Sequence, residues 1–291
     1  MKLPLFLLAL LSLSGPVRAQ EKTETAKTPA TASPVTHAQS DPAFAPRPTP
    51  DHESAVIPVP KTKPGWMARN ESMNQRAAQG HVDLIYLGDS IVQYFNAKGK
   101  KVWDHYYAPR NALNLGISGD RTQHALWRLE HGNIDGISPK LAIVMIGQNN
   151  GGHNTPAEIS DGVTRVVETI RKKLPETKIL LLAIFYRREK PTEERLVFDE
   201  ANATIAKLAD DKTIFYLNIN SIFLLPDGTI SKELMPDYEH PSPLGHRLWA
   251  EAIEGKVAEL MGDQPVLPMP PLAEAPPTPE PTNIPTSAPV R

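Results

Sequence analysis

The sequence predicts an α/β protein in which a doubly wound parallel sheet of about five strands is covered by helices on both faces. Nineteen of the 30 prolines lie in residues 21–64 and 264–291. This leaves a proline-poor middle of about 200 residues, enough to bury a core of its own. Within that middle, short apolar runs alternate with segments of helical periodicity. The runs are continuously apolar, as expected for strands that are covered on both faces.

Five apolar runs are the predicted strands, and turn residues bound them. They are residues 82–87 (VDLIYL), 112–115 (ALNL), 141–146 (LAIVMI), 179–184 (ILLLAI) and 213–217 (TIFYL). In a doubly wound sheet, ligands bind outside the carboxyl ends of the strands. Functional residues are therefore expected directly after these runs.

Three helices are predicted in the second half of the domain. The clearest covers about 156–174, where Thr155 is the N-cap and Glu158 completes a capping box. A second helix is expected over about 192–208. A third begins after Ser242, with a proline at its first position. In each helix the apolar residues recur at helical spacing.

The first 19 residues have the pattern of a secretory signal. Lys2 supplies a positive charge, residues 3–13 are apolar, and 17–19 (VRA) place small residues before a cleavage point. The apolar run is too short to span a membrane, so cleavage is expected and an uncleaved anchor is the alternative. The mature chain is therefore expected in a periplasm, cell envelope or extracellular space, with no stable membrane span.

Composition sets the domain limits and excludes several kinds of function. Residues 20–64 and 263–291 are rich in proline and small polar residues and are expected to be disordered, on either side of a folded domain at 65–262. The chain has no cysteine, which excludes thiolate metal sites, cysteine nucleophiles and disulfides. Its net charge of −2, without a basic stripe, argues against a nucleic-acid partner.

A candidate nucleophile follows the first predicted strand. Asp89 and Ser90 stand on a turn between the strand end and a helix start, where a serine hydroxyl is well placed for attack. The plainer interpretation of this pair is a helix N-cap, and the turn by itself does not decide between the two.

Candidate oxyanion donors follow the second and third predicted strands. Residues 114–120 (NLGISGD) contain Gly119, whose backbone N–H can point at an anion; a conformational loop and a phosphate cradle are the alternatives. Residues 147–152 (GQNNGG) contain Asn149, whose side-chain amide can donate to the same charge, although this segment also suits an ordinary turn.

A candidate general base follows the fifth predicted strand. His240 can accept the proton of a serine hydroxyl, and Asp237, three residues earlier, can orient the ring through its other nitrogen. Each of these motifs is weak when taken alone. Together, the strand ends supply a nucleophile, oxyanion donors and an oriented base, which is a complete set of roles for acyl transfer.

These motifs resemble the conserved blocks of the GDSL/SGNH hydrolase family, and most closely those of the intracellular type of platelet-activating-factor acetylhydrolases. The resemblance covers roughly residues 65–262 and rests on GDS at 88–90, GISGDRT around Gly119, IGQNN around Asn149 and DYEHPSPLGH at 237–246. It implies a flavodoxin-like, three-layer α/β/α sandwich. It implies neither a metal nor an organic cofactor.

The resemblance also implies a role for each matching residue. Ser90 would be the acylated nucleophile, with His240 as base and Asp237 as its partner. The backbone N–H groups of Ser90 and Gly119, with the side chain of Asn149, would form the oxyanion hole. This chain has two departures, which are Gln148 in place of a usual threonine and His246 in place of a common tyrosine. Both, with Asp89, are expected to line the pocket.

The sequence therefore predicts an exported serine esterase that hydrolyses short-chain esters, acetyl esters above all, through an acyl-serine intermediate. Its partner would be a small ester substrate, an acylated glycan or lipid. Two alternatives stay open. One is a non-catalytic glycan-binding module on the same fold, and the other is a carbohydrate O-acyltransferase that uses the same serine. The sequence does not determine the oligomeric state.

Overall fold

The computed structural model of the protein describes residues 54–270. The expected signal at 1–19 and most of the two expected tails lie outside the described residues. Across residues 54–270, no helix has the length and apolar character needed to cross a membrane.

A five-stranded parallel sheet forms the centre of the described domain, in the order β2-β1-β3-β4-β5. The strands are β1 (Leu84–Gly88), β2 (Ala112–Gly116), β3 (Leu141–Met145), β4 (Lys178–Leu182) and β5 (Ile214–Leu217). Each predicted apolar run forms a strand whose ends lie within two residues of the prediction. The predicted α/β class and strand number are therefore confirmed.

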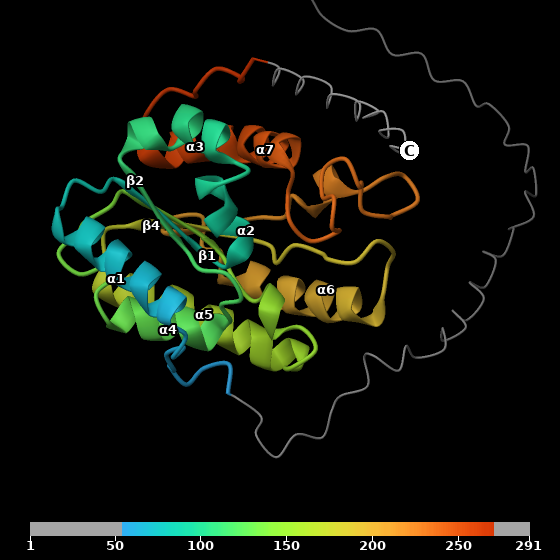
Figure 1. Ribbon diagram of the computed structural model, residues 1–291, viewed down its shortest axis with the longest axis horizontal. Coiled ribbons are helices and arrows are strands. Elements are labelled where there is room, and N and C mark those ends of the chain that lie inside the picture. The colour runs from blue at the N-terminus through green and yellow to red at the C-terminus, as the bar shows by residue number, and fades with distance from the viewer. Residues whose placement is uncertain (1–53, 271–291) are drawn as a thin grey trace, which may run out of the picture. The chain divides into compact units, whose positions relative to one another are not determined.

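Helices cover both faces of the sheet (Figure 1). One face carries α1 (Pro64–Ala78), α4 (Thr122–Glu130), α5 (Pro156–Lys173) and α6 (Glu193–Ile205), and the other carries α2 (Ser90–Gln93), α3 (Lys100–Tyr106) and α7 (Pro243–Met261). Short 3₁₀ turns cover Tyr94–Asn96, Ala108–Arg110, Gln148–Asn150, Ala206–Leu208 and Asn220–Phe223. Because successive side chains of a strand point to opposite faces, Ile85 and Leu87 pack in the first layer and Leu84 and Tyr86 in the second.

The three predicted helices are present with the expected starts. Thr155 Oγ1 accepts the backbone N–H of Glu158 at 3.3 Å, and the Glu158 carboxylate accepts the backbone N–H of Thr155 at 2.8 Å, which is the predicted capping box. Ser242 Oγ accepts the backbone N–H of Gly245 at 3.0 Å at the start of α7. The second predicted helix, α6, ends at Ile205 and continues as the 3₁₀ turn over 206–208.

The ordered domain extends beyond the predicted range of 65–262. Ala55 is only 3% exposed, and its carbonyl accepts the Thr122 hydroxyl at 2.7 Å. At the other end, the backbone N–H of Met269 donates to the Tyr106 hydroxyl at 3.1 Å. Contacts with the rest of the domain hold both of these flanking segments, and composition does not report such contacts.

The strand order places a crevice at the carboxyl ends of β1 and β3. The chain moves from β1 to β2 on one side and then returns to add β3 on the other side of β1. The connections after β1 and β3 therefore leave the sheet toward opposite faces, and a gap opens between them. Ser90 follows β1 and Asn149 follows β3, so the sequence motifs meet at this switch point.

Candidate active site

Ser90 is the first residue of α2, and only Asp89 separates it from the end of β1. The helix α2 packs closely on the end of the neighbouring strand, β2. A Cβ atom on Gly116, the last residue of β2, would lie 2.4 Å from the backbone nitrogen of Gln93, which belongs to α2. Only a glycine permits this approach. The close packing leaves Ser90 7% exposed, so its side chain lies at the base of the crevice.

The structure brings the predicted nucleophile, base and orienting carboxylate together. His240 Nε2 lies 2.9 Å from Ser90 Oγ, although 150 positions separate the two residues in sequence. His240 Nδ1 lies 2.9 Å from Asp237 Oδ2. These distances are those of hydrogen bonds, and they connect the hydroxyl to the carboxylate through the imidazole ring.

Hydrogen bonds within the loop that carries Asp237 and His240 stabilise its conformation. Asp237 Oδ1 accepts the backbone N–H of His240 at 2.7 Å and that of Glu239 at 3.2 Å. Burial acts to raise the pKa of Asp237, but the hydrogen bonds from the backbone and ring of His240 outweigh it and the pKa is lowered. The carboxylate therefore stays charged beside the ring. Tyr94 covers the imidazole from one side, with a centroid separation of 4.8 Å.

Two backbone donors border the serine. Gly119 has φ +73° in a turn that the hydrogen bond from Asp120 N to Ile117 O closes at 3.1 Å. Within residues 54–270, the backbone N–H groups of Ser90 and Gly119 donate to no acceptor. Gln93 Oε1 accepts the backbone N–H of Ser118 at 2.7 Å and so ties the turn to the helix of the nucleophile.

Asn149, the third expected donor, already has acceptors in the folded chain. Its Nδ2 atom lies 3.0 Å from the carbonyl oxygen of Asp120 and 3.2 Å from Asp89 Oδ2. An oxyanion would therefore have to share or replace one of these bonds, and the longer bond to Asp89 is the weaker of the two.

The structure places the three expected pocket residues, Asp89, Gln148 and His246, in the interior, where each is 0% exposed. Asp89 caps α2 by accepting the backbone N–H of Ile91 at 3.0 Å, and burial raises its pKa to about 7. Gln148 donates to the carbonyl oxygen of Phe185 at 3.2 Å. Burial lowers the pKa of His246 to about 4. All three lie in the packed interior beneath the crevice. How deeply a residue is buried there depends on tertiary packing and not on the local sequence.

A buried charged network supports the Gly119 turn from below. Asp120 accepts hydrogen bonds from Arg128 Nε at 2.8 Å and from Trp66 Nε1 at 2.6 Å, and both charged side chains are fully buried. Arg128 also donates to the carbonyl oxygen of Leu115 at the end of β2. The sequence prediction missed this network. Its only signal was an aspartate that directly follows Gly119.

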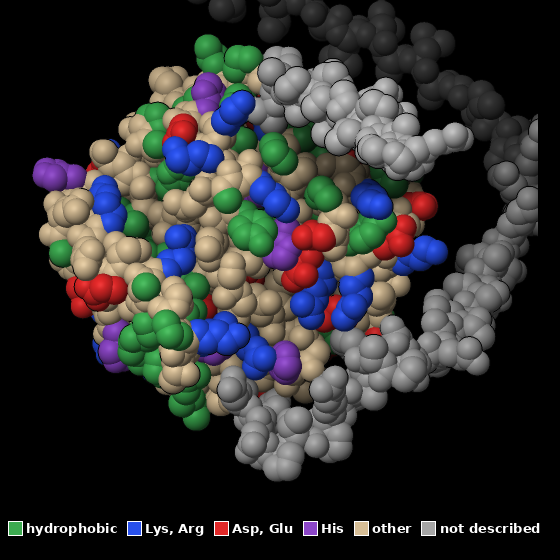
Figure 2. Space-filling view, in the orientation of Figure 1, with side chains coloured by type: hydrophobic (Ala, Val, Ile, Leu, Met, Phe, Trp, Pro, Cys, Tyr) green, Lys and Arg blue, Asp and Glu red, His purple; other side chains and the backbone are tan. Residues whose placement is uncertain are grey.

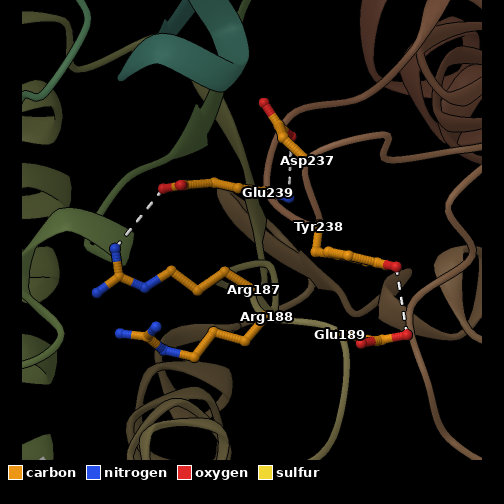
Figure 3. A pocket seen from close by; sticks show the side chains of 6 residues that line it. All are labelled: Arg187, Arg188, Glu189, Asp237, Tyr238 and Glu239. Atoms are coloured by element: carbon orange, nitrogen blue, oxygen red, sulfur yellow. Dashed lines mark hydrogen bonds and ion pairs between the residues drawn. The ribbon is translucent and has the colours of Figure 1, made fainter. Parts of the chain in front are cut away.

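Two hollows are each lined in part by a residue of the site, Asp237 in the first and Gly119 in the second. The first, of about 390 Å³, is lined by residues 187–189 and 237–239 (Figure 3). There Arg187 points across to Glu239 at 3.6 Å and is also paired with Glu194, and the backbone N–H of Arg188 donates to the carbonyl oxygen of Tyr238 at 2.9 Å. Acidic and basic side chains gather beside a histidine near the middle of the face in Figure 2. The contacts of Arg187 with Glu239 and of Arg188 with Tyr238 fix the loop of Asp237 and His240 from its outer side.

The second hollow, of about 420 Å³, is lined in part by Ser118 and Gly119 of the oxyanion turn. Lys61, Lys63 and Arg69 contribute to its wall. Lys61 belongs to the segment that the sequence assigned to a linker, so it was missed as a site residue. Across the described range, no group of three or more His, Asp or Glu side chains is arranged to hold a metal ion.

Residues 86–248 match the model of the GDSL-like Lipase/Acylhydrolase family. The chain is 32% identical over 197 residues to platelet-activating factor acetylhydrolase IB subunit alpha1 of Homo sapiens, which covers 67% of this chain and 84% of the relative. It is 31% identical over 204 residues to the alpha2 subunit of Rattus norvegicus, which covers 69% of this chain and 86% of that relative.

A solved structure of similar fold is a GDSL-like lipase from Bacteroides thetaiotaomicron. The two chains superpose with a TM-score of 0.54 at 16% sequence identity, over 66% of this chain and 98% of the other. At this level of identity the likeness concerns the fold, and it agrees with the five-stranded sheet described above.

Proposed function

Because this chain belongs to the GDSL-like lipase/acylhydrolase family, we propose that it is a serine esterase that hydrolyses short-chain esters, acetyl esters above all. One observation carries the proposal. Ser90 Oγ, the imidazole of His240 and the carboxylate of Asp237 form a continuous hydrogen-bonded chain with two separations of 2.9 Å. A binding module would have no need of this arrangement, since it serves to move a proton.

The proposed reaction has two steps. His240 Nε2 takes the proton of Ser90 as Oγ bonds to the acyl carbon, and the carbonyl oxygen becomes an oxyanion. The free N–H groups of Ser90 and Gly119 stabilise this charge, together with the amide of Asn149. The carbon–oxygen bond to the alcohol then breaks, and the alcohol leaves with the proton from the histidinium. Water repeats the sequence on the acyl-serine and releases the acid.

The preference for a short acyl group and the site of action rest on separate arguments. The curated relatives reported above are named as acetylhydrolases, and each aligns over more than four fifths of its length. We carry the acetyl preference over on that basis. Export is proposed from the signal pattern of residues 1–19, and an exported esterase of this kind would meet acylated glycans or lipids of a cell envelope.

The direct test is hydrolysis of p-nitrophenyl esters from acetate to octanoate by the wild type and by Ser90→Ala. We expect the wild type to favour acetate, and the variant to lose at least about 10³-fold in kcat. A fluorophosphonate probe should label the wild type at Ser90 and leave the variant unlabelled, as judged by peptide mass spectrometry.

Ser221→Ala is the matched control, because Ser221 is an exposed serine in the 3₁₀ turn over 220–223. It should hydrolyse and label like the wild type. If the wild type is no faster than Ser90→Ala on any ester and takes up no probe, the esterase proposal is wrong and a glycan-binding role becomes the better explanation.

A further inference from the structure

The hollow beside Gly119 carries an excess of positive charge. Three of its nine lining residues are the cations Lys61, Lys63 and Arg69, and none of the nine is acidic. Arg69 is anchored through Nε to the carbonyl oxygen of Gly116 at 2.7 Å. A concave wall with several cations and no lining carboxylate attracts anions.

Among the side chains of residues 54–270, the carboxylate paired with Lys61 is that of Asp120, which is shared with other donors. Lys61 Nζ lies 3.7 Å from Asp120 Oδ1, but Asp120 already binds Arg128 and Trp66. Burial lowers the pKa of Lys61, attraction by Asp120 opposes this, and repulsion from Lys63 and Arg121 adds to the lowering. The cations therefore repel one another, and a bound anion would relieve that repulsion.

Lys61 is held in place by the ordered segment that precedes α1. The backbone N–H of Val59 donates to the carbonyl oxygen of Gln123 at 3.2 Å, and the buried Ala55 anchors the start of the segment. Lys61 itself donates to the carbonyl oxygen of Gly119, and its side chain is 22% exposed. Its ammonium group is thus positioned by the fold, which lowers the entropy that binding would otherwise cost.

The hollow is adjacent to the reacting centre. Gly119, the proposed oxyanion donor, forms part of its wall, and so does Gln93. Gln93 lies three residues after Ser90 in α2, which corresponds to about 5 Å along one helical turn. Because Gly119 belongs both to the proposed oxyanion hole and to the wall of the hollow, we expect one substrate molecule to reach both.

We propose that this hollow is a subsite for an anionic group, a carboxylate or a phosphate, on the alcohol part of the ester substrate. The inference rests on the proposed esterase function, and the anion belongs to the alcohol because the proposed acyl group is short. Lys61 and Lys63 would bind the anion with Arg69. The natural substrates would then be acyl esters of acidic sugars or of phosphorylated alcohols.

The experiment compares three acetate esters, which are neutral 4-methylphenyl acetate, 4-acetoxybenzoate and 4-acetoxyphenyl phosphate. The readout is the ratio of kcat/KM for each anionic ester to kcat/KM for the neutral ester, measured at low and high salt. Comparing this ratio between variants cancels the intrinsic reactivity of the esters. We expect Lys61→Gln and Lys63→Gln each to lower the ratio about tenfold, and Lys61→Arg to retain it.

Lys140→Gln is the matched control, since Lys140 is exposed and stands immediately before β3, at the opposite edge of the sheet. It should leave the ratio unchanged. Lys63 is exposed, so its variant tests the proposal even if Lys61→Gln fails to fold. A larger ratio for the carboxylate ester indicates acidic sugars, and a larger ratio for the phosphate ester indicates phosphorylated alcohols.

The failures of the two proposals are distinguishable. If the wild type hydrolyses the neutral ester in a Ser90-dependent way but both lysine variants keep the wild-type ratio, the anionic subsite is refuted and the esterase stands. Equal losses on all three esters also refute the subsite, because Lys61 would then only hold the Gly119 turn. If the wild type hydrolyses none of the esters, the esterase proposal itself fails.

Discussion

Arg128→Met tests whether the buried ion pair beneath the Gly119 turn stabilises the domain. Arg128 and Asp120 are both 0% exposed, and their side chains meet at 2.8 Å. Methionine is apolar and of similar length, so it fills much of the space but leaves the Asp120 carboxylate without its main partner. Breaking one side of a buried pair typically costs 3–5 kcal/mol, roughly, in the free energy of unfolding.

The structure places the expected cost at the lower end of that range. Lys61 lies 3.7 Å from the same carboxylate, and Trp66 continues to donate to it, so Asp120 keeps some compensation. We expect Arg128→Met to lower the free energy of unfolding by about 3 kcal/mol. For a domain of this size, that corresponds to a fall of roughly 6–12 °C in Tm.

Urea denaturation followed by circular dichroism measures this cost. A double-mutant cycle with Asp120→Asn measures how much of the cost comes from the interaction between Arg128 and Asp120. Asp120→Asn should cost less than Arg128→Met, because Arg128 still donates to the Leu115 carbonyl at 3.0 Å and to Asn133 at 2.6 Å. The loss in free energy of unfolding in the double variant should be about 2 kcal/mol smaller than the sum of the losses in the two single variants. Additive effects, or a cost below about 1 kcal/mol for Arg128→Met, would refute the reasoning.

Two further outcomes follow from the site and its surroundings. Asp237→Asn should reduce kcat/KM on the acetate ester by about 10³–10⁴-fold, because the amide would donate to Nδ1 of His240 and leave its Nε2 protonated. The exposed control Glu233→Gln should keep wild-type activity. A loss below about tenfold for Asp237→Asn would contradict the orienting role. His246→Leu removes a buried histidine whose pKa burial lowers to about 4 from a reference near 6.5, so the stabilising effect of the neutral ring is complete above pH 6.5 and is lost as the pH falls toward 4. In urea titrations, the free energy of unfolding of the wild type should therefore fall relative to that of His246→Leu by up to about 3 kcal/mol between pH 7 and pH 4. A constant difference between the two proteins would show that His246 does not titrate in this way.

The sequence predicted the fold and the principal residues of the site because both depend on local patterns. A strand buried on both faces must be continuously apolar, and this periodicity located all five strands to within two residues. Residues that follow parallel strands must meet at one edge of the sheet. Ser90, Asp237 and His240 were therefore expected to converge, and the two separations of 2.9 Å are the result.

The depth at which a residue lies could not be predicted from the sequence. Gln148 and His246 stand inside matching motifs, which suggested a place in the pocket, but the structure buries both completely. The burial of a residue depends on which other helices and strands pack against it. His246, for example, packs against Phe95 at a centroid separation of 4.7 Å, and 151 positions separate the two in the chain. No local pattern encodes that distance.

The tertiary structure alone decided what surrounds the reacting atoms. Lys61 stands in a stretch whose composition indicated a linker, yet it contacts Gly119 because distant hydrogen bonds hold its segment on the domain. The amide of Asn149 was expected to donate to an oxyanion, and only the folded chain shows Asp89 and Asp120 as its acceptors. Periodicity and motif order report which elements form and which ends they share. Charge balance and hydrogen-bond partners come from side chains far apart in sequence, and folding must first bring them together.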